Sequence, residues 1–396
     1  MSELHFKRGL GMGEQVRDQL ARDYHSVIVE RLRLSGFSVT VDDTTIRLAE
    51  EFGFCYGVER AVDYAYQTRE RFPDRNLFIA GEIIHNPGVN RRLREMEIRF
   101  LDGSDGPPPL EPREGDVVII PAFGVPVDRL AAFRQRGCLL VDTTCGSVLN
   151  VWKNVERYAK EGFTSIIHGK YRHEETLATA SRALQYPGGR FLVVRDLDQA
   201  ETVCTYILRG GDGGAFLVTF EGAASPGFDP DRDLERIGLA NQTTMLSSES
   251  LAIAGMIRGA LAGKYGEGSI PDRYRSFDTI CSATQDRQDA VKNLVAGGVN
   301  LMIVIGGYNS SNTAHLHEIS AASVPSYHVA NADCLASRET IRHMPLGSDT
   351  EVATGGWLPA GPLVIGLTAG ASTPNSEVGA VIERLLEFRG HGPLPE

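Results

Sequence analysis

The sequence lacks the features that mark several common classes of protein. No run approaches the roughly 18 apolar residues that a membrane-spanning helix needs. The first residues show no uncharged apolar core followed by a small-residue cleavage site, and their acidic side chains argue against a transit peptide. Lysine and arginine form no cluster, and the net charge is −11, which disfavours a general nucleic-acid surface. We therefore expect a soluble cytoplasmic protein with no nucleic-acid or membrane partner.

Cysteine is scarce and widely spaced. Six cysteines occur in 396 residues, at positions 55, 138, 145, 204, 281 and 334. This spread is unlike the dense disulfide framework of a small secreted domain. The close Cys-x-x-Cys pairs that are typical of zinc sites are also absent. We expect reduced thiols or a metal site.

The pattern of apolar residues predicts an α/β fold. Apolar runs of strand length alternate with helical patterns, which favours βαβ units with mainly parallel sheets. The runs are LFIAGEII, DVVIIPAF, TSIIHG, RFLVV, AFLVTF, LMIVIGG and PLVIGLTAG. The length predicts two or three domains. Segments rich in Gly, Pro and acidic residues at 102–116 and 221–235 are predicted to be surface loops.

One sequence unit occurs three times. Cys55 in FGFCYGVERAV, Cys145 in TTCGSVLNVWK and Cys281 in TICSATQDRQDAV each follow a short extended stretch and precede a helical pattern. A polar loop follows each cysteine by 28 to 30 residues, and these loops contain His85, His173 and Asn309. The unit predicts three thiols and three polar loops at the carboxyl ends of strands, where ligands bind in open α/β sheets. An arrangement around a pseudo-threefold axis would make the cysteines converge, whereas three core cysteines in similar units are the plain alternative.

Three converging thiolates suit an iron–sulfur cluster better than zinc. Thiolates are soft ligands, and each iron of a cluster ordinarily takes one protein ligand. A four-iron cluster with three cysteines leaves one iron open to a substrate oxygen, which favours catalysis over electron storage. Gly53 and Gly57 beside the first cysteine leave room for a group near the backbone. The remaining cysteines, Cys138, Cys204 and Cys334, are predicted to lie in or beside apolar strands without a polar-loop partner, and we interpret them as structural.

The polar loops offer mostly neutral hydrogen-bond donors of the kind that bind an oxygen-rich anion such as diphosphate. Each loop taken singly is also a normal capped turn. Glu175 is the one carboxylate in the set, and it is either a proton relay or a first-turn acid that favours the helix dipole. The donors are His85, His173, Gln242, Thr243, Thr244, Ser310, Ser311, Asn312 and Ser372.

These motifs together resemble the LytB family of 4-hydroxy-3-methylbut-2-enyl diphosphate reductases over roughly residues 47–385. The segments that carry the resemblance, in the family's order, are FGFCYGVERA, EIIHNPGVNRRL, TTCGSVLNVWK, HEETLATAS, NQTTM, TICSATQDRQDAV, GGYNSSNT and TAGASTP.

The resemblance implies a fold, a cofactor and a reaction. It implies a trefoil of three pseudo-symmetric α/β domains around a central [4Fe–4S] cluster held by Cys55, Cys145 and Cys281. The implied reaction removes the substrate hydroxyl as water with two electrons and two protons, giving isopentenyl and dimethylallyl diphosphate. The implied electron donor is reduced ferredoxin or flavodoxin. The implied parts of the chain are an N-terminal helical extension at 1–45, domains at 46–140, 141–272 and 273–365, and a closing C-terminal segment at 366–396.

The resemblance also assigns roles to single residues. Glu175 and Thr243 serve proton delivery at the hydroxyl, and Thr244 is a neighbour of the substrate. The residues implied to hold the diphosphate are His85, His173, Ser310, Ser311, Asn312 and Ser372. Many members have Ala-His-Gly where this chain reads PAFGVP, so Phe123 replaces a histidine and cannot donate to phosphate. This change, the extension and HNPGVNRRL are similar to the plant and cyanobacterial branch.

Two questions stay open at the level of sequence. The segment VRDQLARDYHSVIVERLRLSG in the extension is predicted to be an amphipathic helix, which either covers a domain or supports a homodimer. The alternative functions are a non-redox [4Fe–4S] dehydratase acting on another hydroxylated anion, and a zinc-binding or thiol-nucleophile protein without inorganic sulfide.

Overall fold

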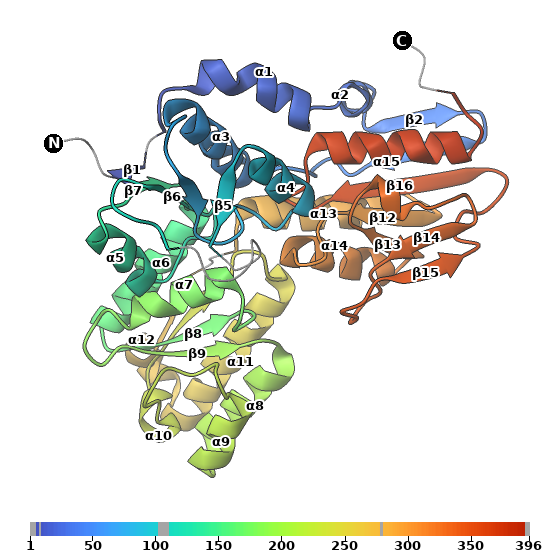
Figure 1. The fold of residues 1–396 in the computed structure, drawn as a ribbon. Coiled ribbons are helices and arrows are strands. Elements are labelled where there is room, and N and C mark those ends of the chain that lie inside the picture. The colour runs from blue at the N-terminus through green and yellow to red at the C-terminus, as the bar shows by residue number, and fades with distance from the viewer. Residues whose placement is uncertain (1–4, 8, 102–110, 278–279, 393–396) are drawn as a thin grey trace. The chain divides into compact units, whose positions relative to one another are not determined.

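The computed structural model describes residues 5–7, 9–101, 111–277 and 280–392, and it confirms the α/β class (Figure 1). The chain divides into two compact units. The first unit consists of residues 1–7, 78–81 and 101–281, and the second consists of residues 8–77, 82–100 and 282–396. Among the described residues, no helix is both long and apolar enough to cross a membrane.

The first unit contains strands of two sheets. In one sheet the strands lie in the order β1 (His5–Phe6), β7 (Leu139–Asp142), β6 (Val117–Ile120) and β4 (Leu77–Ile79). The other has the order β11 (Tyr274–Ser276), β10 (Ile237–Asn241), β8 (Thr164–His168) and β9 (Arg190–Val194), all parallel. The helices are α5 (Val127–Gln135), α6 (Gly146–Lys160), α7 (Glu174–Ala183), α8 (Leu197–Arg209), α9 (Gly213–Thr219), α10 (Pro230–Asp233), α11 (Ser247–Tyr265) and α12 (Ile270–Arg273).

The second unit is built on a third sheet. Its order is β13 (Ser326–Val329), β12 (Leu301–Ile305), β16 (Leu363–Ala369), β3 (Thr44–Leu48) and β2 (Ser38–Val41), and only β2 is antiparallel to its neighbour. All five residues of β12 are buried, as expected for a strand covered on both faces. The unit also contains β5 (Ile98–Phe100) and the antiparallel pair β14 (Thr340–His343) and β15 (Val352–Gly355). Its helices are α1 (Gly13–Tyr24), α2 (Val27–Leu34), α3 (Tyr56–Arg71), α4 (Pro87–Glu95), α13 (Ser282–Ala296), α14 (Ser311–Ala321) and α15 (Asn375–Phe388).

The N-terminal extension forms two helices where the sequence pattern predicted one. The break falls at His25 and Ser26, which have extended backbone, and the Ser26 hydroxyl accepts the Val29 N–H at the start of α2. Helix α1 packs on α3, while α2 packs on α15 and places Val29 and Leu32 in the core of the second unit. The two helices of the extension therefore cover the second unit, which is the first of the two alternatives that the sequence left open.

The segment AFLVTF was predicted to be a strand, and this prediction is wrong. It lies in helix α9, because the Asp212 carboxylate accepts the N–H groups of Gly214 and Ala215 and so caps a helix. Phe216 and Phe220 then lie on one helical face, with their ring centroids 4.7 Å apart. The apolar run is so short that it fits both the helical and the strand period, and the cap at Asp212 decides for the helix.

The prediction of a surface loop at 221–235 is also wrong in part. Ala223, Phe228 and Leu234 are buried in the core of the first unit, and residues 230–233 form helix α10. Asp229 caps this short helix, and Pro230 occupies its first position. In the other predicted loop, residues 102–110 lie outside the described residues, while 111–115 form no helix or strand.

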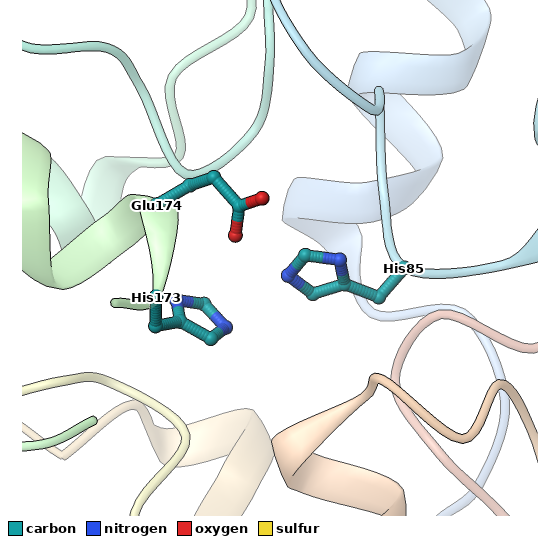
Figure 2. A group of neighbouring side chains, drawn as sticks. All are labelled: His85, His173 and Glu174. Carbon is teal, nitrogen blue, oxygen red and sulfur yellow. The ribbon is translucent and has the colours of Figure 1, made fainter. Parts of the chain in front are cut away.

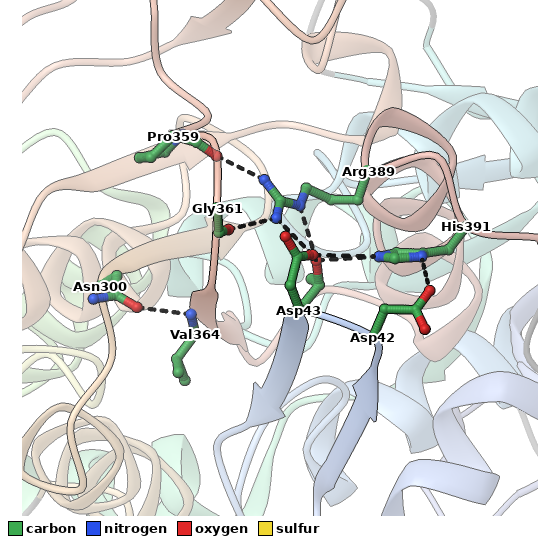
Figure 3. Close-up of polar contacts among 9 residues, drawn as sticks. Asp42, Asp43, Asn300, Pro359, Gly361, Val364, Arg389 and His391 are labelled. Atoms are coloured by element: carbon green, nitrogen blue, oxygen red, sulfur yellow. Dashed lines mark hydrogen bonds and ion pairs between the residues drawn. The ribbon is translucent and has the colours of Figure 1, made fainter.

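The C-terminal end of α15 is clamped to the β2–β3 hairpin by Arg389 (Figure 3). Its guanidinium donates to the Asp43 carboxylate at 2.8 Å, to the Thr44 hydroxyl at 2.8 Å, and to the carbonyls of Pro359 and Gly361 at 2.7 and 2.6 Å. The Arg389 side chain is 3% exposed, so these acceptors take the place of water. The hydrogen bond from Arg389 holds the pKa of Asp43 below its usual range.

We predict that Arg389→Lys lowers the free energy of unfolding by about 1–3 kcal/mol, because an ammonium cannot reach these four acceptors at once. Urea unfolding monitored by circular dichroism measures the change. Arg384→Lys is the matched control on the same helix. Arg384 pairs with the exposed Glu387, lies over the Phe388 ring and donates to one carbonyl, that of Leu335, at a long 3.4 Å, so we expect a change within about 0.5 kcal/mol. Equal losses in the two variants would contradict the clamp.

Candidate functional site

The three repeats predicted from the sequence have the same local structure. Cys55 and Cys145 occupy the N-cap positions of α3 and α6, and Cys281 directly precedes α13. Each polar loop also ends at a helix start: Asn86, His173 and Ser310 cap α4, α7 and α14. Helix starts carry partial positive charge and unpaired N–H groups, which favour thiolates and anions.

The six free cysteines divide into two classes by exposure. Cys55, Cys145 and Cys281 are partly exposed, whereas Cys138, Cys204 and Cys334 are buried. Burial raises the pKa of the Cys138 thiol, and it raises the pKa of Cys204 to about 11, so both are poor thiolates at neutral pH. Cys204 lies within helix α8, and Cys334 lies in the short 3₁₀ helix Ala332–Cys334, so the predicted placement of these two cysteines in or beside strands is wrong.

In the first unit, hydrogen bonds link the surroundings of Cys145 and Cys281. The Ser147 hydroxyl, in the first turn of α6, donates to the Cys281 sulfur at 3.4 Å. The Cys145 N–H donates to the Ala122 carbonyl at 2.8 Å, and the Cys281 N–H donates to the Thr243 carbonyl at 3.4 Å. The start of α6 and the segment ending at Cys281 are therefore adjacent within this unit.

Glu175 is more than a surface acid in a first helical turn. It is 3% exposed, and its carboxylate accepts the Thr243 N–H at 2.6 Å and the Thr243 hydroxyl at 3.0 Å. Figure 2 shows its neighbours His173 and Glu174 at the start of α7. The His173 Nδ1 accepts the Glu175 N–H at 3.2 Å. The carboxylate thus has a fixed orientation beside the predicted catalytic threonine.

Gln242, next to Thr243, is used for structure. Its side-chain oxygen accepts the Lys170 N–H and the Thr176 hydroxyl, and its amide donates to the Thr244 hydroxyl at 2.9 Å. It therefore joins the loops after β8 and β10, which carry His173 and Thr243.

In the second unit, a polar group surrounds His85, which Figure 2 places on the segment before α4. The His85 Nδ1 lies 2.9 Å from the Glu82 carboxylate, which also accepts the Asn309 amide at 2.8 Å. The Ser372 hydroxyl donates to the His85 carbonyl at 3.0 Å and lies 3.5 Å from the Ser310 hydroxyl oxygen. Three of the predicted anion ligands therefore meet within this unit.

Cys55 and Asn312 share a contact with the loop after β16. The Cys55 N–H donates to the Ala371 carbonyl at 3.2 Å, and the Asn312 side-chain oxygen accepts the Ala371 N–H at 2.9 Å. Asn312 is 2% exposed, and its amide nitrogen has no hydrogen-bond partner among the described residues. Ser311 beside it is also buried. Gly53 has φ of 75°, so the glycine before Cys55 serves the turn itself.

Phe123 is an apolar wall in the first unit. It is buried, and its ring meets the His173 ring edge-on at a centroid distance of 6.2 Å. Gly124 follows with φ of 77°, and a Cβ there would overlap the Trp152 ring. The loop thus positions His173 by packing.

Sequence reasoning missed the residues that hold these candidates in place. Ser147 lies two residues after Cys145, and Glu82 lies three residues before His85, so neither belongs to the repeated cysteine or polar-loop pattern. Glu377 is a further residue that sequence reasoning missed. Its carboxylate accepts the Asn86 side-chain amide at 3.1 Å, at the start of α4. The same carboxylate occupies the space that a side chain on Gly88 would need. Burial raises the pKa of Glu377 to about 7.

The chain is similar to proteins of one family along most of its length. The family model described as LytB protein matches residues 46–386. The relative from Thermosynechococcus vestitus is 49% identical over 98% of this chain and 96% of its own length. The relative from Gloeobacter violaceus is 48% identical over 99% and 94%. Both carry the name 4-hydroxy-3-methylbut-2-enyl diphosphate reductase.

Solved structures show the same fold. One solved structure is described as (E)-4-hydroxy-3-methyl-but-2-enyl diphosphate reductase, the terminal enzyme of the non-mevalonate pathway. It covers 86% of this chain and 99% of its own chain at 28% sequence identity, with a TM-score of 0.53. The enzyme from Plasmodium falciparum matches 89% and 93% at 20% identity, with a TM-score of 0.61, and this likeness concerns the fold alone.

We predict a pH-dependent stability from Glu377. A carboxyl whose pKa is raised on folding stabilises the folded state below its unfolded pKa, near 4.5, and this contribution is lost as the pH rises through about 7. The free energy of unfolding should therefore fall more between pH 5 and pH 7.5 for the wild type than for Glu377→Gln. Urea titrations at both values measure this, and parallel pH profiles would disprove it.

Proposed function

The chain belongs to the LytB protein family, and on that premise we propose that it converts (E)-4-hydroxy-3-methylbut-2-enyl diphosphate to isopentenyl and dimethylallyl diphosphate. Each turnover breaks the substrate's C–O bond, consumes two electrons and two protons and releases water. The observation that carries the proposal is the division of the cysteines: the three in the repeated unit are partly exposed at helix starts, and the other three are buried.

We propose that Cys55, Cys145 and Cys281 hold a [4Fe–4S] cluster. The donor set fits, because it consists of three soft ligands that are free of disulfides and placed where a helix start favours the thiolate. The Ser147 hydroxyl donates to the Cys281 sulfur. Hydrogen bonds of this kind tune the reduction potential of a cluster. When bound, such a cluster supplies electrons and a Lewis-acidic iron.

The polar loops are proposed to bind the diphosphate. In the second unit, His85, Ser310, Ser311, Asn312 and Ser372 combine side-chain donors with the N–H groups at the start of α14. The buried Asn312 amide is a donor of the kind a phosphate oxygen satisfies. In the first unit, we assign His173 as a ligand of the same diphosphate. The Phe123 ring packs against the His173 ring and offers no hydrogen-bond donor of its own.

Glu175 and Thr243 are proposed to deliver a proton to the leaving hydroxyl. Thr243 bonds Glu175 through both its N–H and its hydroxyl, which orients the carboxyl and provides a route for the proton through the hydroxyl. Thr244 is the proposed neighbour on the substrate side, and its hydroxyl is positioned by Gln242.

The remaining proposals concern the setting of the enzyme. We assign reduced ferredoxin or flavodoxin as the electron donor and the cytoplasm as the location. A homodimer is the proposed assembly. We also propose three α/β domains around the cluster, which the three mainly parallel sheets support, and a C-terminal segment at 366–396 that closes over the substrate.

A requirement for reductant tests the reaction type. Anaerobically purified protein should consume the substrate with reduced methyl viologen and should not consume it without reductant, because the products are two electrons more reduced than the substrate. Turnover that needs no reductant would instead identify a dehydratase.

We predict that replacing any of Cys55, Cys145 or Cys281 with serine abolishes activity and depletes iron and sulfide. Cys138→Ser, Cys204→Ser and Cys334→Ser should keep both, apart from a stability cost of about 1–3 kcal/mol for placing a hydroxyl in a buried site. Metal and sulfide analysis after anaerobic purification makes the comparison. Equal depletion in all six variants would exclude the ligand assignment.

We predict that Glu175→Gln slows turnover by roughly 100- to 10,000-fold, because the amide cannot transfer the proton. Diphosphate binding should remain, since the anion donors are unchanged. Single-turnover kinetics and equilibrium binding of the substrate separate the two effects. Near-normal turnover would mean that Glu175 is only a structural acid.

A further inference from the structure

The second unit has an open groove beside Cys55. It lies over helices α1 and α3, and its lining includes Arg17, Tyr24, Arg33, Phe54, Tyr56 and Arg60. Phe54 and Tyr56 are the residues on either side of Cys55 in the chain. The groove therefore reaches the surface next to one of the three proposed cluster ligands.

One aromatic side chain of the groove is exposed, and three others, Tyr24, Phe54 and Tyr64, are half-buried. Tyr56 is 78% exposed in the first turn of α3. The Phe54 ring packs on Tyr24 of the extension, with centroids 5.6 Å apart. Tyrosine and arginine are the residue types that contribute most to binding at protein interfaces.

The charge of the groove differs from that of the whole chain. Three arginines line it, although the net charge of the protein is −11. Arg17 is exposed and makes no ion pair among the described residues, while Arg33 pairs with Glu30 at 3.0 Å. Two acids also line the groove: Glu59, and Asp63, which accepts the Gln67 amide at 2.6 Å. The groove lining therefore holds three arginines against two carboxylates, a small local excess of positive charge on an acidic protein.

We propose that this groove docks a small acidic protein that carries a one-electron centre, so that electrons enter at Cys55. The inference rests on the proposed function, which requires two electrons for each turnover. Two reduced carriers would bind in succession, and each would leave oxidised by one electron. Acidic side chains of the carrier would meet Arg17 and Arg60, and electrostatic complementarity of this kind mainly raises the rate of association.

The test compares two reductants in charge-reversal variants of the intact cluster-loaded enzyme. The variants are Arg17→Glu and Arg17→Glu/Arg60→Glu, and the matched control is Arg22→Glu, which makes the same charge change on α1 outside the groove. With a reduced plant-type [2Fe–2S] ferredoxin, we expect the groove variants to lose on the order of tenfold in kcat/KM for the carrier. The loss should shrink as salt is added. With reduced methyl viologen, all variants should match the wild type.

The outcomes separate this inference from the function on which it rests. No turnover of the wild type with methyl viologen would overturn the proposed function. Normal viologen turnover with an unchanged ferredoxin kcat/KM in Arg17→Glu/Arg60→Glu, or an equal loss in Arg22→Glu, would overturn the docking site alone. A change of oligomeric state in the groove variants, measured by analytical ultracentrifugation, would assign the groove to a second copy of the chain and also overturn it.

Discussion

The structure depends on one constraint: a parallel strand ends where the next helix begins, so that the turn presents side chains and unpaired N–H groups together. In the second unit, β3 leads to Cys55 and α3, and β12 leads to Ser310 and α14. In the first unit, β7 leads to Cys145 and α6, and β8 leads to His173 and α7. Thiolates and anions are both stabilised at such turns, so the repeated unit suits both parts of the proposed chemistry.

The turns are kept in place by hydrogen bonds between loops. Ala371 bonds both Cys55 and Asn312, so the loop after β16 ties a proposed metal ligand to a proposed anion ligand. Gln242 has the corresponding role in the first unit, where it joins the loops that carry His173 and Thr243. Losing a buried polar link of this kind leaves donors and acceptors without partners. These residues therefore act on the site through its geometry.

Much of the fold and of the candidate site could be predicted from the sequence, because the signals are local. A strand, a cysteine or polar loop, and a helix are adjacent in the chain, so the repeat was visible as spacing alone. Local ambiguity caused the errors: AFLVTF fits both strand and helix periods, and the cap at Asp212 decides for the helix. The break at Ser26 is made by a local cap that an amphipathic pattern alone does not mark, and the burial of Phe228 follows from packing against distant segments. The sequence also could not predict the partners of Glu175 and His85, because Thr243, which bonds Glu175, and Asn309, which lies beside His85, are far from them in the chain.

The central claim is that three cysteines, each at a helix start, hold a four-iron cluster in which one iron has no cysteine ligand. Mössbauer spectroscopy of the anaerobically purified protein, loaded with ⁵⁷Fe, tests it directly. The account predicts the signature of a [4Fe–4S] cluster in which one iron differs from the other three, and in which that iron alone changes when the substrate is added. Four equivalent irons that do not respond to the substrate, or a protein that takes up no iron, would contradict it.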